Sequence, residues 1–483
     1  MSDSRVTSIT RSETSVAPDV RRRIILAIVL TVQLMIAVDI TVVNIALPQI
    51  QDHLSFNPTS LSWVINAYTL AYGGLLLLGG RLGDFLGHRR ALLLGVLIFT
   101  AASLFGGFAQ APWWLLTARV LQGAGGALAA PSTLAITVMS FPSDEERTKA
   151  FGIFTIAQGL GSAGGLLLGG LLVDVVSWRW VLFVNVPIGI VVIFATLRYI
   201  VAQPGQRAKF DLGGAVTGTV GITAIVYGFV HAAGAGWQDS GTAIAFAVGL
   251  ALLVAFIAIE SRHPQPLLRL RLFADRDRSG GFLVFVCSGA AMFGMFYFLT
   301  QFVQNVENFS PLTAAFAFLP MAVPMIFIPG QVTPRLVQRF GARVTMMLGL
   351  GLIAVAMIWL TQLTASTGYF EGVFGPMLLA GCGVGLLNPP LTGTIMAAVP
   401  PEDAGVASGA LQAVGMIGGS VGTSILVTIF GSATRGNPLG ATARPVLAHG
   451  IAVACIGGAG FAVLGFLIVL LIIRSARRAV APA

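Results

Sequence analysis

The sequence predicts an all-α integral membrane protein of fourteen transmembrane helices, arranged as two six-helix bundles with two extra helices between them. Three observations predict this class. Of the 483 residues, 56% are hydrophobic and only 10% are charged, whereas about 25% of the residues of a soluble protein are charged. Apolar runs of about 20 residues, long enough to cross a bilayer as helices, recur along the chain. Short motifs also repeat at a nearly constant interval.

The apolar runs place the helices one by one. In chain order, we expect them at residues 24–47, 60–80, 90–109, 113–138, 148–172, 179–200, 212–232, 241–260, 279–304, 313–333, 343–363, 370–396, 403–431 and 448–473. Because their number is even, both termini are expected on the same side of the membrane.

Lysine and arginine predict which side that is. In this placement, 24 of the 28 Lys and Arg residues lie on the side of the termini, in the loops and tails or within three residues of the adjoining helix ends. Cytoplasmic loops are enriched in these residues. We therefore expect a plasma-membrane protein whose tails, at 1–23 and 474–483, are both cytoplasmic. The net charge of +9 therefore reflects orientation and attraction to anionic lipids, and it does not indicate nucleic-acid binding.

Three pairs of motifs repeat in order. LGDFLGHR (82–89) matches LVQRFGAR (336–343), and AQGLGSAGG (157–165) matches LQAVGMIGG (411–419), both at an interval of 254 residues. GAGGALAAP (123–131) matches GCGVGLLNP (381–389) at an interval of 258. Such repeats are typical of membrane transporters. They predict homologous bundles at 24–200 and 279–473, joined by a linker, 201–278, that contains the two accessory helices.

No pattern in the sequence is typical of an enzyme or a metal protein. Cys287, Cys382 and Cys455 lie inside apolar runs, and their spacing fits neither a disulfide framework nor a zinc site. The five histidines are scattered, and no nucleophile, base and acid occur as a catalytic set. We therefore expect no enzymatic activity, no metal and no cofactor.

Asp39 is an acidic residue inside the first apolar run. A charge at the bilayer centre costs about 2.5–3.5 kcal/mol on insertion scales, so such a residue needs a reason to be there. Three interpretations are open: a structural carboxylate paired with a buried arginine, a water-exposed group near the outer helix end, or a proton carrier facing the central cavity. A carboxyl balanced between a low dielectric and a nearby cation can load and release a proton near neutral pH.

The other polar residues of this helix lie on a different face. Gln33 and Asn44 are about 20° apart around the helix, and Asp39 is about 120–140° from both. We therefore expect Asn44 to bond between helices or to contact substrate, rather than to share the role of Asp39. Arg119 is the one basic residue that we place inside a span. It needs an anion or a water-filled cavity, unless it is an anchor at the helix end.

The segment GGRLGDFLGHRR (79–90) follows the second helix and is expected to be a loop. Its glycines permit a tight turn, and a loop that only sets the orientation is one interpretation. Its spacing, Gly-x-x-x-Asp-x-x-Gly-x-Arg-Arg, resembles the cytoplasmic gate motif of the major facilitator superfamily. The resemblance implies a gating role for Gly80, Arg81, Gly83, Asp84, Gly87, Arg89 and Arg90.

Four more segments resemble the fourteen-helix drug:proton antiporter family of that superfamily. DITVVNIALP (39–48) is similar to its first helix, SWVINAYTLAYGGLLLLGGRLGD (62–84) to its second, RVLQGAGGALAAP (119–131) to its fourth and SWRWVLFVNVPIG (177–189) to the entry of its sixth. The resemblance implies a major facilitator fold and proton-coupled transport. It links Asp39 to coupling and gives Arg119, with Gln122 one turn on, a role in proton transfer.

Two features depart from the family pattern. GLGSAGGLLLGG (159–170) resembles the antiporter motif of the fifth helix, and its stripe of Gly161, Gly165 and Gly169 allows close helix packing. However, Leu166 stands where the family usually has proline, which weakens the case for strict antiport. The C-terminal half has no second acid well inside a span, and Glu307 is either a secondary proton or cation site or a solvated loop acid.

Polar and aromatic positions of the helices expected around the cleft between the bundles are candidates for substrate contact. They are Asn44, Trp63, Asn66, Tyr68, Gln122, Gln158, Tyr297, Gln301, Gln304, Asn388 and Gln412.

The sequence as a whole predicts efflux of hydrophobic or cationic drugs by alternating access, driven by the proton gradient. We expect a monomer whose partners are a small-molecule substrate, protons and the lipid bilayer. One alternative is a dedicated exporter of one endogenous metabolite or antibiotic. Another is a membrane receptor or assembly partner that transports nothing.

Overall fold

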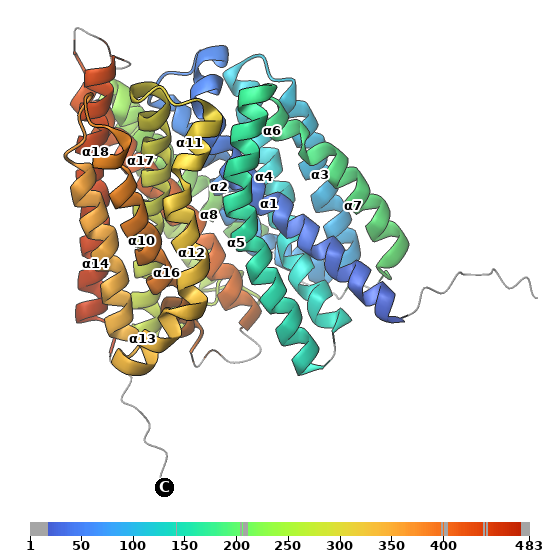
Figure 1. Cartoon of the computed structure of the whole chain (residues 1–483). Coiled ribbons are helices and arrows are strands. Elements are labelled where there is room, and N and C mark those ends of the chain that lie inside the picture. The colour runs from blue at the N-terminus through green and yellow to red at the C-terminus, as the bar shows by residue number, and fades with distance from the viewer. Residues whose placement is uncertain are drawn as a thin grey trace, which may run out of the picture.

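The computed structural model describes residues 18–141, 143–202, 205, 211–397, 399, 404–437, 440 and 443–474. Within these ranges the regular elements are all helices, and no strand occurs (Figure 1). All fourteen predicted segments are helical. The expectation of an all-α fold is therefore confirmed.

The N-terminal bundle contains six long helical segments. They are α1 (Pro18–Leu54), a short turn at Ser60–Ser62 leading into α2 (Trp63–Leu86), α3 (His88–Gly107), α4 (Pro112–Ser140), α5 (Asp144–Val175), and α6 (Trp180–Phe183) continued by α7 (Asn185–Tyr199). The accessory helices are α8 (Leu212–Ala235) and α9 (Ser240–Glu260).

The C-terminal bundle follows a short turn at Leu270–Phe273. It contains α10 (Arg276–Gln301) extended by a π-helical turn (Phe302–Val306), α11 (Pro311–Ala317), α12 (Leu319–Gln331), α13 (Thr333–Phe340), α14 (Ala342–Leu360), α15 (Tyr369–Gly372), α16 (Phe374–Met396), α17 (Ala404–Thr434) and α18 (Arg444–Leu471). The predicted helix 313–333 is divided between α11 and α12 just before Pro320, because proline removes a backbone donor.

Twelve helices of the described residues are long and apolar enough to cross a membrane. The two predicted spans outside this set are α4 and α5. Their 29 and 32 residues correspond to about 43 and 48 Å at 1.5 Å per residue, which is ample for a bilayer. However, α4 is rich in small and polar residues, and α5 contributes only Gly164–Val175 as a shorter apolar helix. The chain is therefore a multi-pass membrane protein, and fourteen crossings remain the prediction.

The two bundles pack their helices in the same pattern. In the N-terminal bundle α1 packs on α5, α3 on α4 and α3 on α7, and in the C-terminal bundle α10 packs on α17, α14 on α16 and α14 on α18. Glycines make the equivalent close contacts. A Cβ on Gly125 would lie 2.7 Å from the Gly95 carbonyl oxygen, and one on Gly383 would lie 2.6 Å from that of Gly349.

The helices of both bundles run between two ends of the molecule. The start of α1 and the end of α18 lie at the lower end in Figure 1, which we call the termini end. The α1–α2 turn lies at the opposite end, which we call the far end. The two bundles meet where α2 packs on α17, α5 on α11 and α1 on α10.

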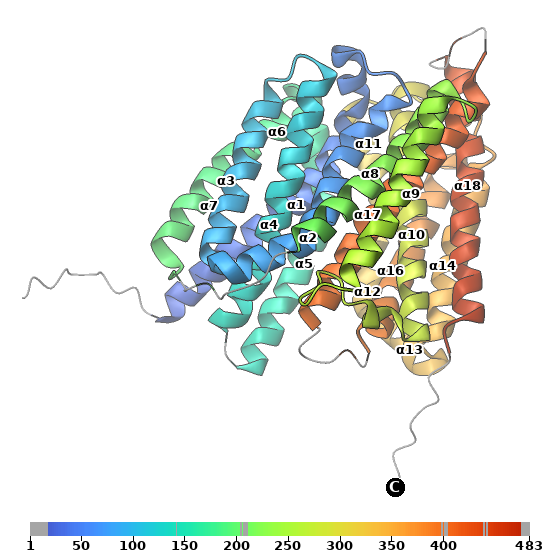
Figure 2. The ribbon, with the colours of Figure 1, turned by 180° about the vertical axis from the view of Figure 1, so that it is seen from behind.

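The accessory helices are attached mainly through α8, which packs on α17 and α2 (Figure 2). Thr428 of α17 donates to the Phe229 carbonyl at 2.6 Å, and Arg435 donates to the Ala232 carbonyl at 2.7 Å. These bonds fix α8 to α17 near the far end.

Two boundaries differ from the sequence-based prediction. The first helix begins at Pro18 rather than at residue 24, so Arg21, Arg22 and Arg23 are helical. Residues 79–86 are not a loop: they form the last part of α2, and the turn to α3 is Gly87 alone, at φ 83°. Gly341 makes the same turn between α13 and α14 at φ 87°. Both positions need glycine because L-residues disfavour positive φ.

Candidate functional site: a buried ion pair and a far-end pocket

Asp39 lies near the middle of α1 and is fully buried inside the N-terminal bundle. Its Oδ2 accepts a hydrogen bond from Arg119 Nη1 of α4 at 2.6 Å. Its Oδ1 accepts from Gln122 Nε2 of α4 and from Asn185 Nδ2 of α7, each at 3.0 Å. Both carboxylate oxygens therefore have donors, and α1 is tied to α4 and α7 at one point.

The guanidinium of Arg119 is also surrounded by partners and is 1% exposed. Its Nη1 donates to Gln122 Oε1 at 2.9 Å, and its Nε donates to the Val64 carbonyl of α2 at 3.0 Å. Its Cζ lies 4.4 Å from the centre of the Tyr68 ring, within cation–π distance. Gln122 Nε2 also donates to Ser103 Oγ of α3 at 2.8 Å. The network thus joins five helices of the bundle.

Small residues on α4 allow this close approach. A Cβ on Gly123 would lie 2.5 Å from the Tyr68 carbonyl oxygen, and one on Gly126 would lie 3.1 Å from the Tyr72 ring. The backbones of α4 and α2 therefore come close enough for Arg119 to reach Val64 and Tyr68. This is the role that small residues play between membrane helices.

This geometry corrects two expectations and part of a third. Asp39 is not a water-exposed group near a helix end, and Arg119 is not an end anchor, because it lies a full two turns inside α4. Asp39 does not face a cavity between the bundles, since its neighbours belong to its own bundle. The burial of Asp39 and Arg119 is tolerated because each charge is satisfied by the other and by further hydrogen bonds.

The other polar residues of α1 lie away from Asp39. Asn44 donates to the Ile40 carbonyl of its own helix at 3.0 Å, so this bond does not join two helices as we had considered. The Oδ1 of Asn44 and the Oε1 of Gln33 are buried without a hydrogen-bond partner. Unsatisfied buried acceptors are uncommon, and a ligand or water is a usual partner for them.

The gate motif lies at the termini end. Asp84 is half exposed, and its Oδ1 lies 3.6 Å from His88 Nε2 across the Gly87 turn. Arg89 donates to the Leu197 carbonyl at 2.7 Å and ties this turn to the end of α7. Arg81 donates to the Pro266 carbonyl of the linker at 3.4 Å.

The glycines of this motif set the packing. A Cβ on Gly83 would lie 2.9 Å from His88 Nδ1, whereas one on Gly80 would meet only Pro131, at 3.7 Å. Arg90 is exposed. The motif therefore connects α2, α3, α7 and the linker at one end of the bundle.

Asn66 of α2 bridges the two bundles. Its Nδ2 donates to Ser424 Oγ and its Oδ1 accepts from Ser420 Oγ of α17, both at 2.9 Å and fully buried. Trp63, three residues earlier, packs against Tyr227 of α8 with the two rings tilted at 43° and their centroids 6.3 Å apart. These two cavity candidates therefore hold helices together.

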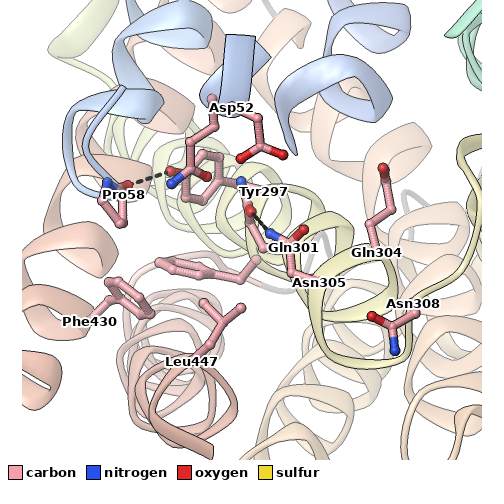
Figure 3. Close-up of a pocket in the computed structure, with 11 residues that line it drawn as sticks. Asp52, Pro58, Tyr297, Gln301, Gln304, Asn305, Asn308, Phe430 and Leu447 are labelled. Atoms are coloured by element: carbon pink, nitrogen blue, oxygen red, sulfur yellow. Dashed lines mark hydrogen bonds between the residues drawn. The ribbon is translucent and has the colours of Figure 1, made fainter. Parts of the chain in front are cut away.

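Three other cavity candidates, Tyr297, Gln301 and Gln304, line a pocket of about 270 Å³ at the far end, between α1 and the end of α10 (Figure 3). Tyr297 donates to the Pro58 carbonyl at 3.2 Å, and Gln304 donates to the Ile45 carbonyl at 3.0 Å. The pocket thus lies where the two bundles are bonded to each other.

The remaining candidates are dispersed. Tyr68 is buried in the N-terminal bundle against Arg119 and Tyr72, Asn388 is exposed, and Gln412 is partly exposed on α17. The side chain of Gln158 lies outside the described residues. Glu307 caps the π-helical turn, where burial raises the pKa of its carboxyl and a bond from the Tyr369 backbone opposes that shift.

The glycine stripe of α5 lies against α1. A Cβ would lie 3.1 Å from Ala37 Cβ at Gly161, 2.2 Å from Thr41 Oγ1 at Gly165 and 2.8 Å from Val42 Cγ2 at Gly169. The stripe therefore brings α5 onto the face of α1 that carries Ala37, Thr41 and Val42.

Sequence reasoning missed a pair of acids in the accessory hairpin. Asp211 caps α8 and Glu260 ends α9, both 3% exposed. Asp211 Oδ2 and Glu260 Oε1 are buried without a hydrogen-bond partner. Both approach Gly214, where a Cβ would lie 2.6 and 2.9 Å from them. The sequence contained a signal for this pair: one acid precedes the first accessory helix and the other ends the second. Two consecutive antiparallel helices bring those positions side by side.

The same search missed the polar partners Asn185 and Ser103. Asn185 lies within the SWRWVLFVNVPIG segment that resembles the sixth helix of the antiporters. A polar residue in the apolar part of this segment was the signal that could have marked Asn185 as a partner of Asp39.

Comparison with known proteins shows which family the chain resembles. The Major Facilitator Superfamily profile matches residues 29–423. The cephamycin export protein CmcT of Amycolatopsis lactamdurans is 39% identical over 417 residues, covering 86% of each chain. The puromycin resistance protein pur8 of Streptomyces alboniger is 39% identical over 420 residues, covering 86% of this chain and 83% of pur8.

Solved structures share the fold at low identity. A bacterial homologue of the lysosomal transporter Spinster, in an inward-facing and unoccupied conformation, superposes with a TM-score of 0.66 at 18% identity. It covers 93% of this chain and 96% of its own. The nucleoside transporter NupG also has a TM-score of 0.66, at 12% identity, over 94% of this chain and all of its own.

Proposed function

We propose, from the premise that this chain belongs to the Major Facilitator Superfamily, that it exports hydrophobic or cationic organic compounds in exchange for protons. It is a transporter rather than an enzyme. Relatives that carry names of antibiotic export and resistance, CmcT and pur8 among them, support efflux. The observation that carries the proton coupling is the buried Asp39–Arg119 pair.

We place both termini in the cytoplasm and the protein in the plasma membrane as a monomer. The excess of Lys and Arg in the loops at the termini end supports this orientation. The far end, with the Tyr297 pocket, then faces outward. Substrate enters from the termini end and leaves at the far end.

The proton step takes place on Asp39. While Asp39 is ionised, Arg119 neutralises it, and α1 is bound to α4 and α7. Protonation of the carboxyl removes the charge that holds Arg119 and weakens the charge-assisted bond. The packing of α1 on α4 then changes, which biases the equilibrium between inward-open and outward-open arrangements.

The bundles move relative to each other along α2–α17 and α5–α11. In this scheme the gate motif at Asp84 and the far-end bonds of Tyr297 and Gln304 close opposite ends in turn. Alternating access of this kind is a rocking of two similar halves.

The test is ethidium-dependent proton flux in proteoliposomes, with Asp39→Asn beside the wild-type protein. Asp39→Asn keeps the shape of the side chain but removes the ionisable group, so we expect ethidium to be transported without a matching proton flux, or not at all. Asp239→Asn, at a partly exposed acid that caps α9 outside the two bundles, is the control and should behave as wild type, because Asn can also cap a helix. Normal coupling in Asp39→Asn would refute the assignment.

A dedicated exporter of one antibiotic is the second candidate, favoured because CmcT and pur8 are each named for a single compound. Competition of ethidium transport by a panel of unrelated cations separates the two: a multidrug exporter is inhibited by many of them. A receptor that transports nothing would leave dye accumulation in overexpressing cells unchanged.

A further inference from the structure

The pocket at the far end contains an amide group that lacks a partner. Gln301 is 5% exposed and lines the pocket. Its Oε1 accepts from Asn305 Nδ2 at 2.7 Å, as Figure 3 shows, whereas its Nε2 is buried without a hydrogen-bond partner. A buried donor left unpaired is destabilising, so a ligand that brings an acceptor to this position gains a hydrogen bond.

The backbone next to Gln301 is also unusual. Residues Phe302–Val306 form a π-helical turn that ends α10, and Asn305 on this turn lines the pocket. Such turns are rare and occur frequently at functional sites. Here the wider turn holds the Asn305 side chain against the side-chain oxygen Oε1 of Gln301. The side-chain nitrogen Nε2 of Gln301 is then the group without a partner.

The rest of the lining favours a cation with an aromatic ring. Tyr297, Phe298 and Phe430 form a chain of rings with centroids 5.0 and 5.5 Å apart. Asp52 lines the same pocket and is exposed. Among the described residues that line it, none is Lys, Arg or His. Aromatic faces and an unopposed carboxylate attract a positive charge.

We propose that this cavity is a ligand site at the far end for a small aromatic amine that carries a hydrogen-bond acceptor. The ammonium group binds Asp52, the ring lies against Tyr297 and Phe298, and the acceptor takes the hydrogen bond of Gln301 Nε2. A cavity of about 270 Å³ suits a compound at the small end of the usual range of pockets.

The site also has a consequence for the transport cycle. Its lining comes from both bundles, with Asp52 and Pro58 on one side and Tyr297 and Gln301 on the other. A ligand there adds contacts that exist only while the far end is closed, so it stabilises that arrangement. This consequence depends on the proposed transport cycle, whereas the binding itself does not.

Binding is tested with three matched probes and one engineered thiol. Tyramine carries the amine, the ring and a hydroxyl acceptor; tyrosol lacks the amine, and phenethylamine lacks the hydroxyl. Gln51→Cys introduces a thiol into the pocket wall, and its maleimide labelling is measured on purified protein in nanodiscs with both faces accessible. Cys287 and Cys455 are buried and Cys382 is partly buried, so wild-type labelling gives the background.

We expect tyramine to protect Gln51→Cys at a concentration at least five-fold lower than either analogue. Adding Asp52→Asn should abolish the preference over tyrosol, and adding Gln301→Leu should abolish the preference over phenethylamine. Glu371→Gln, an exposed acid at the far end outside the pocket lining, is the matched control and should preserve both preferences.

Equal protection by tyrosol and tyramine would overturn the amine assignment, and protection that survives both Asp52→Asn and Gln301→Leu would overturn the site. Saturation-transfer NMR of tyramine on the otherwise wild-type protein gives an independent measurement, and its failure to detect binding would also overturn the proposal. Neither experiment uses a proton gradient, so a failure here is distinct from a failure of proton-coupled export.

Discussion

The two bundles pack their helices alike, yet their interiors differ in polarity. The interval of 254 residues sets Phe293 of α10 opposite Asp39, and the interval of 258 sets Met377 and Ala380 of α16 opposite Arg119 and Gln122. Met377 and Ala380 are fully buried in an apolar core. The C-terminal bundle thus reaches the same arrangement of helices with no charge at these positions.

This difference indicates what the charges are for. If a six-helix unit of this kind packs well around methionine and alanine, the buried ion pair of the N-terminal unit is not required by the fold. Buried ion pairs are often no more stabilising than apolar residues of similar volume. Ionisable residues inside a membrane protein are, by contrast, typical of function.

The largest effect is expected from breaking the pair on one side only. Arg119→Met, which installs the residue of the C-terminal bundle, leaves the Asp39 carboxylate buried without its cation. We expect a loss of about 3–5 kcal/mol in the free energy of unfolding and no proton-coupled transport. An SDS unfolding titration of the purified protein measures the first, and proteoliposome flux measures the second. Wild-type stability of Arg119→Met would mean that Asp39 does not depend on Arg119.

Replacing the whole cluster with apolar residues should separate stability from function. The variant Asp39→Leu, Arg119→Met, Gln122→Ala and Asn185→Leu leaves no member of the pair buried alone. We expect its unfolding free energy to be within about 2 kcal/mol of wild type, while transport stays abolished. If the variant unfolds as readily as Arg119→Met alone, the charges hold this bundle together and the comparison with the C-terminal bundle fails.

The glycine stripe between α5 and α1 should show a smaller effect, and a neighbouring glycine of α5 provides a control. Gly165→Ala brings a Cβ to 2.2 Å from Thr41 Oγ1 and 3.0 Å from Val38 Cα, so α1 and α5 must separate. We expect a loss of about 1–3 kcal/mol, as for other overpacked positions, in the same SDS titration. Gly164→Ala meets nothing within 4 Å and should leave stability unchanged. Equal effects at both positions would argue against close packing as the reason for the stripe.

The smallest effect on stability concerns the gate turn. The C-terminal copy of this turn carries Gln338 where the N-terminal copy carries Asp84, and both turn at a glycine of positive φ. We therefore expect Asp84→Asn to fold as wild type. Ethidium transport should slow several-fold, with ethidium affinity in the resting state changed by less than about three-fold. A large loss of affinity, measured by equilibrium binding, would contradict a gating role.

Much of the fold could be predicted from the sequence, because helix lengths and charge asymmetry follow directly from the properties of the bilayer. The fourteen helical segments match, whereas the breaks at Val184 and Phe318 do not appear in hydropathy. The extension of α2 to Leu86 was missed because glycines suggested a loop. In this case those glycines serve helix contacts, and Gly87 alone makes the turn.

The site was less predictable, because it depends on which helix faces touch. Pairing of Asp39 with a buried arginine was one of three interpretations from the sequence, and Arg119 was the evident cation. Asn185 and Ser103 were missed, since a polar residue in an apolar helix does not reveal its partner. Asp211 and Glu260 were missed because each lies at the end of a different helix, and the packing of α8 on α9 brings them together.

The low hydropathy of α4 has a consequence for how the protein enters the membrane. This helix is not apolar enough to be counted among the evident spans, and Arg119 raises its insertion free energy further, since an arginine at a helix centre costs about 2.5–3.5 kcal/mol. Its counter-ion, Asp39, lies 80 residues earlier and is therefore synthesised first. Stable insertion of α4 then depends on α1 remaining nearby during translation, so biogenesis of the N-terminal bundle is cooperative rather than helix by helix.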